Sequence, residues 1–258
     1  MPLQKSDYEK LSVLTEGDSL PRLLRGLSTE SLDYILDAST SHSVEAGRIL
    51  VQQGDSPEFV FLVLSGTVRT LRIDDTGKEA TIRMLQPADT CMEAVLFMGS
   101  PSPITVQAVT ESRLIFIPEN IVKTLAARDA MFANNLLQIV TYHYKNAMYQ
   151  IEAMNIKTPI QRVGYYLLVK FLERGKGNLE FFFPFRKSMV ANYLGMTAET
   201  FSRTLCKMKN IGITIGEDKV QMKTSHDLCL FCDSDTESLC AEGSKKSYAT
   251  CPRHKKSG

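Results

Sequence analysis

Three polar side chains in the C-terminal half of the chain have the types and the spacing needed to read DNA bases. Glu199, Ser202 and Arg203 stand at positions i, i+3 and i+4, so on a helix they project from one face. Arginine can bond both acceptors of a guanine, a carboxylate can accept from the cytosine amine, and a serine hydroxyl can do either. Thr200 and Lys207 are candidate phosphate contacts. The pattern predicts a helix whose first turns enter the major groove of double-stranded DNA.

Cysteines near the end of the chain are a second group with metal-binding chemistry. Four of the six cysteines lie in the last thirty residues, at Cys229, Cys232, Cys240 and Cys251. Two cysteines separated by two residues can both turn their sulfurs to one ion, and four thiolates can hold zinc or an iron–sulfur cluster. We therefore predict a metal site in this tail. The intervals after Cys232 are irregular for a zinc ribbon, so the alternative is a disordered basic tail with free thiols.

The residues around the polar trio predict two short helices joined by a tight turn. The first helix is expected over 187–194, with Gly195 supplying the turn and Thr197 capping the second helix. The buried face of the second helix is expected to consist of Phe201, Leu205 and Met208. A hairpin over 213–222 would then form the wing of a winged helix. The alternative is an ordinary helical hairpin with a solvated charged face.

A long helix is expected ahead of this element, from about residue 129 to about residue 154. At 1.5 Å per residue it would be about 40 Å long. Its apolar residues recur at steps of three and four and form one stripe: Phe132, Leu136, Ile139, His143, Ala147, Ile151 and Met154. Because a long helix with one continuous seam is a natural coiled-coil element, we predict that this stripe joins two copies in a homodimer. Packing of the stripe on its own domain is the alternative.

Short β-rich runs alternate with turn residues between about residues 42 and 118. The predicted strands are Ile49–Gln52, Phe59–Leu64, Thr67–Ile73, Ala80–Met84, Thr105–Val109 and Arg113–Ile117, with a hairpin connection at Asp75–Gly77. Closely spaced strands of this kind predict an antiparallel barrel or sandwich. Short helices are expected over about residues 6–40, one of them capped by Ser28.

Bulk properties limit the class of protein. The chain has 258 residues, 43% of them hydrophobic, and a net charge of +1, so any DNA-binding surface must be local. It has no apolar run of about 18 residues, and its N-terminus lacks the apolar core of a signal peptide, which points to the cytoplasm and away from a membrane. It also lacks the G-x-S-x-G, H-E-x-x-H and P-loop motifs, so we do not expect an enzyme.

Two segments carry a resemblance to a known family. LGMTAETFSR at 194–203 resembles the motif L-G-x-T-x-E-T-x-S-R of the CRP/FNR regulators, and GRILVQQGDSPEFVFLVLSGTV at 47–68 resembles their β-roll signature. The resemblance covers about residues 15–225. It implies a homodimer on a palindrome, signal binding in the roll, and RNA polymerase as a further partner. The match of Glu199, Ser202 and Arg203 to the FNR-type branch implies a site near TTGAT-N4-ATCAA.

The same resemblance disfavours cyclic AMP as the signal. Members that bind it have G-E-L followed by R-S-A or R-T-A, whereas this chain has MEA at 92–94 and SPI at 102–104. Without that arginine a cyclic phosphate loses a charge-assisted bidentate contact. No cysteine precedes Cys91, so the N-terminal cysteine cluster of FNR-type oxygen sensors is missing as well.

A further likeness concerns haem. Residues 93–109, EAVLFMGSPSPITVQAV, resemble the DNR-type nitric oxide regulators, which implies haem in the β-roll. The candidate ligands are His42, His143, His226 and His254, each with a purely structural histidine as the alternative. His226 or His254 could instead replace one cysteine in the tail site.

Together these features predict an α+β protein in four parts. Residues 1–128 are expected to form a sensor domain with N-terminal helices and a β-roll of the cyclic-nucleotide-binding jelly-roll type. A dimerisation helix over 129–156, a winged helix-turn-helix over 157–225 and a cysteine-containing tail over 226–258 would follow. The predicted function is sequence-specific DNA binding that regulates transcription in response to a small-molecule, gas or redox signal. The alternative is a signal-binding module that acts through protein partners without reading DNA.

Overall fold

The computed structural model describes most of the chain. It covers residues 2–4, 7, 11, 21–99, 101–174, 179–182, 186–216, 219–224 and 227–232. The chain divides into two compact units, 1–147 and 148–258, and the helix α4 (Ala130–Ile156) runs through the boundary between them. No helix in the described ranges is both long enough and apolar enough to cross a membrane.

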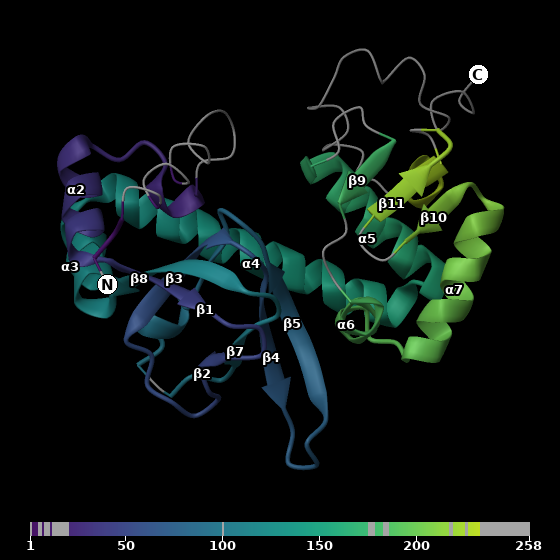
Figure 1. The fold of residues 1–258 in the computed structure, drawn as a ribbon, viewed down its shortest axis with the longest axis horizontal. Helices are drawn as coiled ribbons and strands as arrows, with labels where there is room; N and C mark the ends of the chain where they lie inside the picture. Colours follow the sequence, from purple (N-terminus) through teal and green to yellow (C-terminus); the bar gives the residue numbers. More distant parts are fainter. Residues whose placement is uncertain are drawn as a thin grey trace. The chain divides into compact units, whose positions relative to one another are not determined.

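The first unit contains two four-stranded antiparallel sheets (Figure 1). One has the order β1-β8-β3-β6 and the other β2-β7-β4-β5. Their bounds are β1 Thr40–Val44, β2 Ile49–Val51, β3 Phe59–Ser65, β4 Val68–Ile73, β5 Glu79–Leu85, β6 Thr90–Cys91, β7 Thr105–Ala108 and β8 Ser112–Pro118. All six predicted strands are confirmed, and the two sheets form the predicted roll. Strands β1 and β6 were not foreseen, because TSHSV is mostly polar and β6 has only two residues.

Strand β3 is buried on both faces. Phe61 and Val63 pack between the two sheets, together with Val106 and Leu114. The alternate residues of β3, such as Leu62, pack on the other side against short helices. This two-sided burial explains why residues 59–64 read as a continuous apolar run instead of an alternating one.

Short helices cover one sheet of this unit. They are η1 Arg22–Leu24, α2 Thr29–Ala38, η2 Val95–Phe97 and α3 Glu119–Arg128. Ser28 caps α2 by accepting from the backbone N–H of Ser31 at 3.2 Å, as predicted. Asp129 separates α3 from α4 and caps α4, because its Oδ1 accepts from the backbone N–H groups of Met131 and Phe132 at 2.9 and 3.0 Å.

The predicted hairpin between β4 and β5 is present. Asp74 Oδ1 accepts from the backbone N–H groups of Thr76 and Lys78, both at 2.9 Å. Gly77 has a φ of +81°, which a glycine adopts without steric cost. The aspartate and glycine of this loop therefore fix the register of the two long strands.

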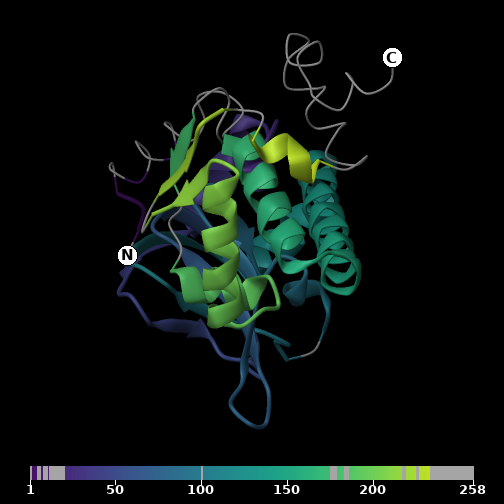
Figure 2. The same cartoon turned by 90° about the vertical axis from the view of Figure 1, so that its right-hand side faces the viewer.

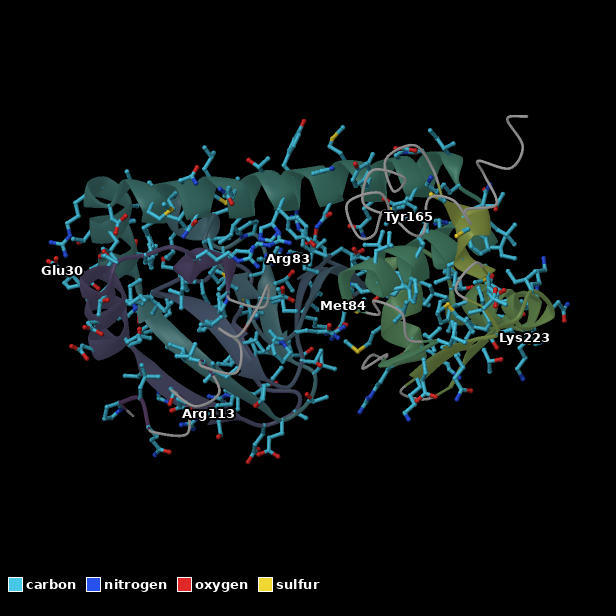
Figure 3. All side chains as sticks on the ribbon, turned by 90° about the horizontal axis from the view of Figure 1, so that it is seen from above. Glu30, Arg83, Met84, Arg113, Tyr165 and Lys223 are labelled. Atoms are coloured by element: carbon cyan, nitrogen blue, oxygen red, sulfur yellow. The ribbon has the colours of Figure 1, made fainter. Side chains whose placement is uncertain are left out.

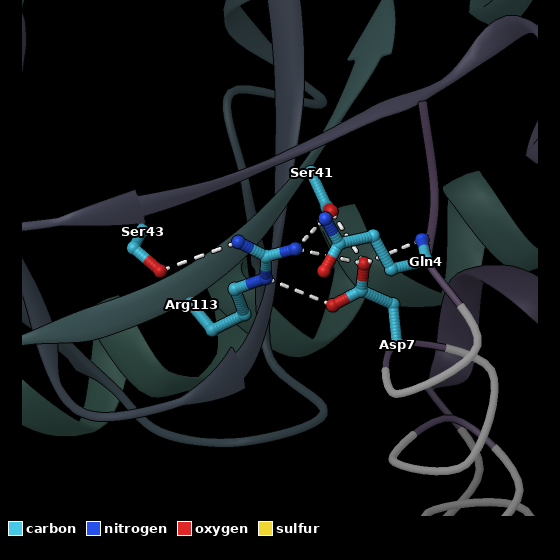
Figure 4. A network of polar contacts seen from close by, with 5 residues as sticks. All are labelled: Gln4, Asp7, Ser41, Ser43 and Arg113. Atoms are coloured by element: carbon cyan, nitrogen blue, oxygen red, sulfur yellow. Dashed lines mark hydrogen bonds and ion pairs between the residues drawn. The ribbon is translucent and has the colours of Figure 1, made fainter. Parts of the chain in front are cut away.

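A buried ion pair ties the start of the chain to the first sheet (Figure 4). Arg113 on β8 donates from Nε to Asp7 Oδ1 at 2.8 Å and from Nη2 to Asp7 Oδ2 at 2.9 Å. Ser41 and Ser43 on β1 bond the same network, and the backbone N–H of Gln4 donates to the carboxylate at 2.9 Å. The side chain of Asp7 has no exposed surface. Hydrogen bonds from Arg113 hold the pKa of Asp7 well below its usual value.

The predicted dimer stripe on α4 is wrong in its first half. Phe132, Leu136 and Ile139 are buried within their own unit, where they pack on the short helices. The large apolar side chains that α4 leaves exposed include Leu137, Val140, Tyr144 and Met148, each one position after a predicted stripe residue, and also Ile151 and Met154 of the predicted stripe itself. Leu137 is 65% exposed and Tyr144 is 67% exposed. The helix has two apolar faces, and steps of three and four fit both of them.

The second unit is a winged helix-turn-helix, as predicted. Its helices are α5 Pro159–Arg174, α6 Lys187–Tyr193, α7 Ala198–Asn210 and the short turn η3 Asp227–Phe231. Its strands are β9 Glu180–Phe182, β10 Ile213–Ile215 and β11 Lys219–Met222, in the order β10-β11-β9. Figure 2 shows these strands beside α7. The core beneath them includes Val163, Leu167, Val190, Phe201, Met208 and Val220.

Candidate DNA-binding site and effector region

The cap of α7 fixes where the recognition helix begins. Thr197 Oγ1 accepts from the backbone N–H of Thr200 at 3.1 Å, as the sequence predicted. Phe201 and Met208 are buried as expected, whereas Leu205 is only half-buried. Thr204 lies in the buried face as well, and its hydroxyl donates to the carbonyl of Thr200 at 2.8 Å. That local bond lets a polar residue sit in the interface.

The polar trio lies together on the exposed face of α7. Glu199, Ser202 and Arg203 are all exposed, and the guanidinium of Arg203 pairs with the carboxylate of Glu199. The side chain of Arg203 is 75% exposed and that of Glu199 is 72% exposed. An ion pair this exposed contributes little to stability. Both groups can therefore give up their contact with each other and bond base edges instead.

Further exposed cations lie on α6 and α7. Lys207 is exposed one turn beyond Arg203, and Arg186 and Lys187 are exposed at the start of α6. The first helix of a helix-turn-helix crosses the DNA backbone, so the latter two side chains suit phosphates. The sequence reasoning missed them, although their place at the start of the first helix was a usable signal. The hydroxyl of Thr200 is hydrogen-bonded to the hydroxyl of Thr197, the residue that caps α7, at 2.9 Å. Thr200 would therefore have to contact a phosphate while it is part of this cap.

A buried acidic group lies inside the β-roll. Burial raises the pKa of Glu93, and its Oε1 has no hydrogen-bond partner among the described residues. Arg83 on β5 opposes that shift and donates to the carbonyl of Thr90 at 3.0 Å. Ser102, which the family resemblance aligns with the phosphate-binding arginine, is buried, and its hydroxyl donates to the carbonyl of Ile104 at 2.7 Å. Ser102 is thus bonded locally and adds no positive charge.

Two of the four histidines fall within the described residues. Burial, followed by the charges of Arg83 and Arg22, lowers the pKa of His143 on α4 to about 3. Its Nε2 is buried without a hydrogen-bond partner in the described part of the chain. Figure 3 shows Arg83 beside this helix. A neutral imidazole is the form that ligates a metal, and a nitrogen that makes no hydrogen bond could serve as the ligand atom in the tautomer that leaves it unprotonated, so His143 fits a haem ligand chemically.

His42 on β1 is less suited to that role. Its ring packs edge-on against Phe116 at a centroid distance of 4.7 Å, and its Nε2 lies 3.1 Å from the hydroxyl of Thr40. His226 and His254 lie outside the described residues.

Comparisons with known proteins agree with both the β-roll and the winged helix-turn-helix. Residues 41–129 match the family model of the cyclic nucleotide-binding domain. The transcriptional activator protein FnrA of Stutzerimonas stutzeri is 26% identical over 83% of this chain and 88% of its own length. The cyclic AMP receptor protein of Thermus thermophilus is 27% identical over 78% of this chain and 92% of its own length. These findings support a transcription regulator of the CRP/FNR type.

A similar fold is also seen in a solved structure. FixK2 from Bradyrhizobium japonicum superposes with a TM-score of 0.69 and 19% identity, covering 76% of this chain and 98% of that one. At this identity the likeness concerns the fold alone. It agrees with a β-roll followed by a winged helix-turn-helix.

The first cysteine pair of the tail is docked on the winged-helix unit. Cys229 lies in η3, and the backbone N–H of Cys232 donates to its carbonyl at 3.2 Å. Leu228 is fully buried, and the ring of Phe231 lies so close to α5 that a Cβ on Gly164 would come within 2.2 Å of it. Cys240 and Cys251 lie outside the described residues, so the four-cysteine site stays a prediction.

Metal analysis tests that prediction. We expect protein purified without oxygen to contain zinc or iron above background, and the Cys229→Ser and Cys232→Ser changes to remove it, because each takes away a thiolate ligand. Cys206→Ser is the matched control, since Cys206 is exposed on α7 outside the tail and should leave the metal content unchanged. Wild-type protein without metal and with all four tail thiols freely reactive would contradict the prediction.

Proposed function

We propose that this CRP/FNR regulator binds palindromic double-stranded DNA as a homodimer and changes its DNA affinity in response to a small-molecule, gas or redox signal. The observation that carries the proposal is the exposed trio of Glu199, Ser202 and Arg203 on the first turns of a capped α7. FnrA of Stutzerimonas stutzeri is named as a transcriptional activator, which supports a regulatory and not a catalytic role. RNA polymerase is the further partner that this role implies, and the cytoplasm is its compartment.

The residue roles follow from hydrogen-bond chemistry. Arg203 would bond the two acceptors of a guanine and Glu199 would accept from a cytosine amine, with Ser202 beside them. Thr200 and Lys207 would bond phosphates and set the register. A half-site of the TTGAT type offers the required bases.

The exposed face of α4 supports the homodimer. Leu137, Val140, Tyr144, Met148 and Ile151 follow steps of three and four and leave a long apolar stripe in water in the single chain. Two copies with parallel α4 helices would cover it and present two α7 helices to one palindrome.

The competing hypothesis is a signal-binding module that acts only through protein partners. It explains the exposed apolar stripe of α4 but not the polar trio of α7. Nothing in helix packing requires Glu199, Ser202 and Arg203 to share one exposed face. For the signal itself, cyclic AMP is disfavoured because Ser102 replaces the needed cation. Haem bound through His143 is the proposal supported by a buried Nε2 that has no hydrogen-bond partner among the described residues.

Arg203→Ala tests base reading directly. We expect it to weaken binding to a TTGAT-N4-ATCAA duplex by about 1–3 kcal/mol, roughly 5- to 150-fold, and to change binding to a scrambled duplex little. Lys207→Ala is the control, because loss of a phosphate contact should weaken both duplexes alike. Fluorescence anisotropy at fixed salt measures both. Equal losses on the two duplexes for Arg203→Ala would mean that Arg203 does not read a base.

A further inference from the structure

The turn between α6 and α7 is held from outside the two helices. A helix leaves its last carbonyls without partners inside the helix. Here three successive carbonyls at the end of α6 accept from side chains of other elements. Gln150 on α4 donates from Nε2 to the carbonyl of Tyr193 at 2.8 Å. Arg162 on α5 donates from Nη1 to the carbonyls of Leu194 and Gly195 at 2.8 and 3.2 Å.

A methionine adds a steric contact to these hydrogen bonds. Gly195 has a φ of +63°, and a Cβ at that position would lie 3.1 Å from Cε of Met154, which belongs to the last turn of α4. The turn is therefore bonded on its carbonyls and packed on its Cα side. All of these contacts lie inside the second unit, residues 148–258.

The guanidinium of Arg162 satisfies carbonyls at the end of α6 that have no partner within the helix. Its Nε is buried without a hydrogen-bond partner in the described part of the chain, and none of the described carboxylates forms an ion pair with it. Arg162 as a whole is only half-buried, and donors bonded to the last carbonyls of a helix hold the chain at that point. What they fix is the path of the chain into α7. The core of the unit is made by other residues, such as Val190 and Phe201.

We infer that Gln150, Met154 and Arg162 are positioning residues for DNA reading, which set the place of the α6–α7 turn and thereby the angle at which α7 presents its polar trio. The inference rests on the proposed function. None of the three residues is expected to touch DNA. Base readout depends on the angle of the helix in the groove, whereas phosphate attraction tolerates small rotations. Loosening the turn should therefore reduce sequence discrimination more than overall DNA affinity.

Arg162→Met and Arg162→Lys test this, with Gln150→Leu as an independent variant. Anisotropy would compare the TTGAT-N4-ATCAA duplex with a scrambled duplex of equal length, using the full chain. We expect Arg162→Met to lower affinity for the palindrome about tenfold, the cost of roughly one base contact, and affinity for the scrambled duplex less than about twofold. Arg162→Lys should recover part of the loss, because an ammonium reaches one carbonyl but lacks the planar fork. Gln150→Leu should cost about threefold on the palindrome alone, as loss of one neutral hydrogen bond.

Thermal unfolding and size-exclusion chromatography of the same samples separate this role from a merely structural one. An Arg162→Met protein that keeps full affinity for the palindrome, or loses equally on both duplexes, would overturn the inference. Wild-type protein that fails to distinguish the two duplexes would overturn the proposed function and the inference together. A loss confined to the palindrome, with partial rescue by lysine, supports it.

Discussion

Leu137→Asp should convert the protein to a monomer and remove tight binding to a full palindrome. Leu137 lies in the exposed apolar stripe of α4 that we propose as the dimer seam. In a symmetric dimer the change occurs twice, and each copy loses about 1.5–3 kcal/mol of apolar burial and must also bury a carboxylate. A total near 5 kcal/mol would raise the dimer dissociation constant by about three to four orders of magnitude. Analytical ultracentrifugation and anisotropy on the palindrome measure the two effects.

Gln138→Asp is the matched control for this experiment. Gln138 is exposed and adjacent, but it projects about 100° away from the stripe, so the same carboxylate there should leave the dimer intact. Ile139→Asp should behave differently again. Because Ile139 is 2% exposed and packs within its own unit, that change should lower thermal stability and not act on the seam. A dimeric Leu137→Asp protein with undiminished palindrome affinity would show that another surface joins the copies.

The contrast between Leu137 and Ile139 shows where sequence reasoning succeeds and where it fails. The helix itself was predictable, because steps of three and four over many residues fit no strand. Which of two adjacent apolar faces is left exposed was not, because only the placement of the short helices against Phe132 and Leu136 decides it. Helix α7 was predictable because the residues that define it lie close together in the sequence. Its cap at Thr197 and its exposed trio are set by residues within one turn of each other.

Long-range polar contacts lay beyond the reach of the sequence. Gln150 and Tyr193 are 43 positions apart, and Arg162 and Leu194 are 32 apart, with no periodicity that links them. The same holds for Asp7 and Arg113, which are 106 positions apart. Such pairs depend on the tertiary arrangement of whole elements, whereas hydrophobic patterns and caps depend on local geometry.

The second large effect is expected from the ion pair between Asp7 and Arg113. Asp7→Asn should lower the free energy of unfolding of the first unit by about 2–4 kcal/mol at pH 7, because it leaves Arg113 mostly buried without a countercharge. The side chain of Arg113 is 16% exposed, so the loss should lie below that of a fully buried pair. Urea unfolding followed by circular dichroism measures the difference. Glu119→Gln, which breaks the exposed pair of Glu119 with Lys123, is the control and should cost less than about 1 kcal/mol.

The pH dependence identifies the carboxylate as the cause. Hydrogen bonds from Arg113 depress the pKa of Asp7 in the folded state, so protonation is harder there than in the unfolded chain. The stabilisation is therefore complete above the unfolded pKa of about 4 and is lost as the pH falls below it toward the folded value. The difference between wild type and Asp7→Asn should be constant from about pH 7 to about pH 5 and shrink below about pH 4. A difference that persists unchanged at pH 3 would mean that the ionised carboxylate contributes nothing, and that Asn at this position acts through packing alone.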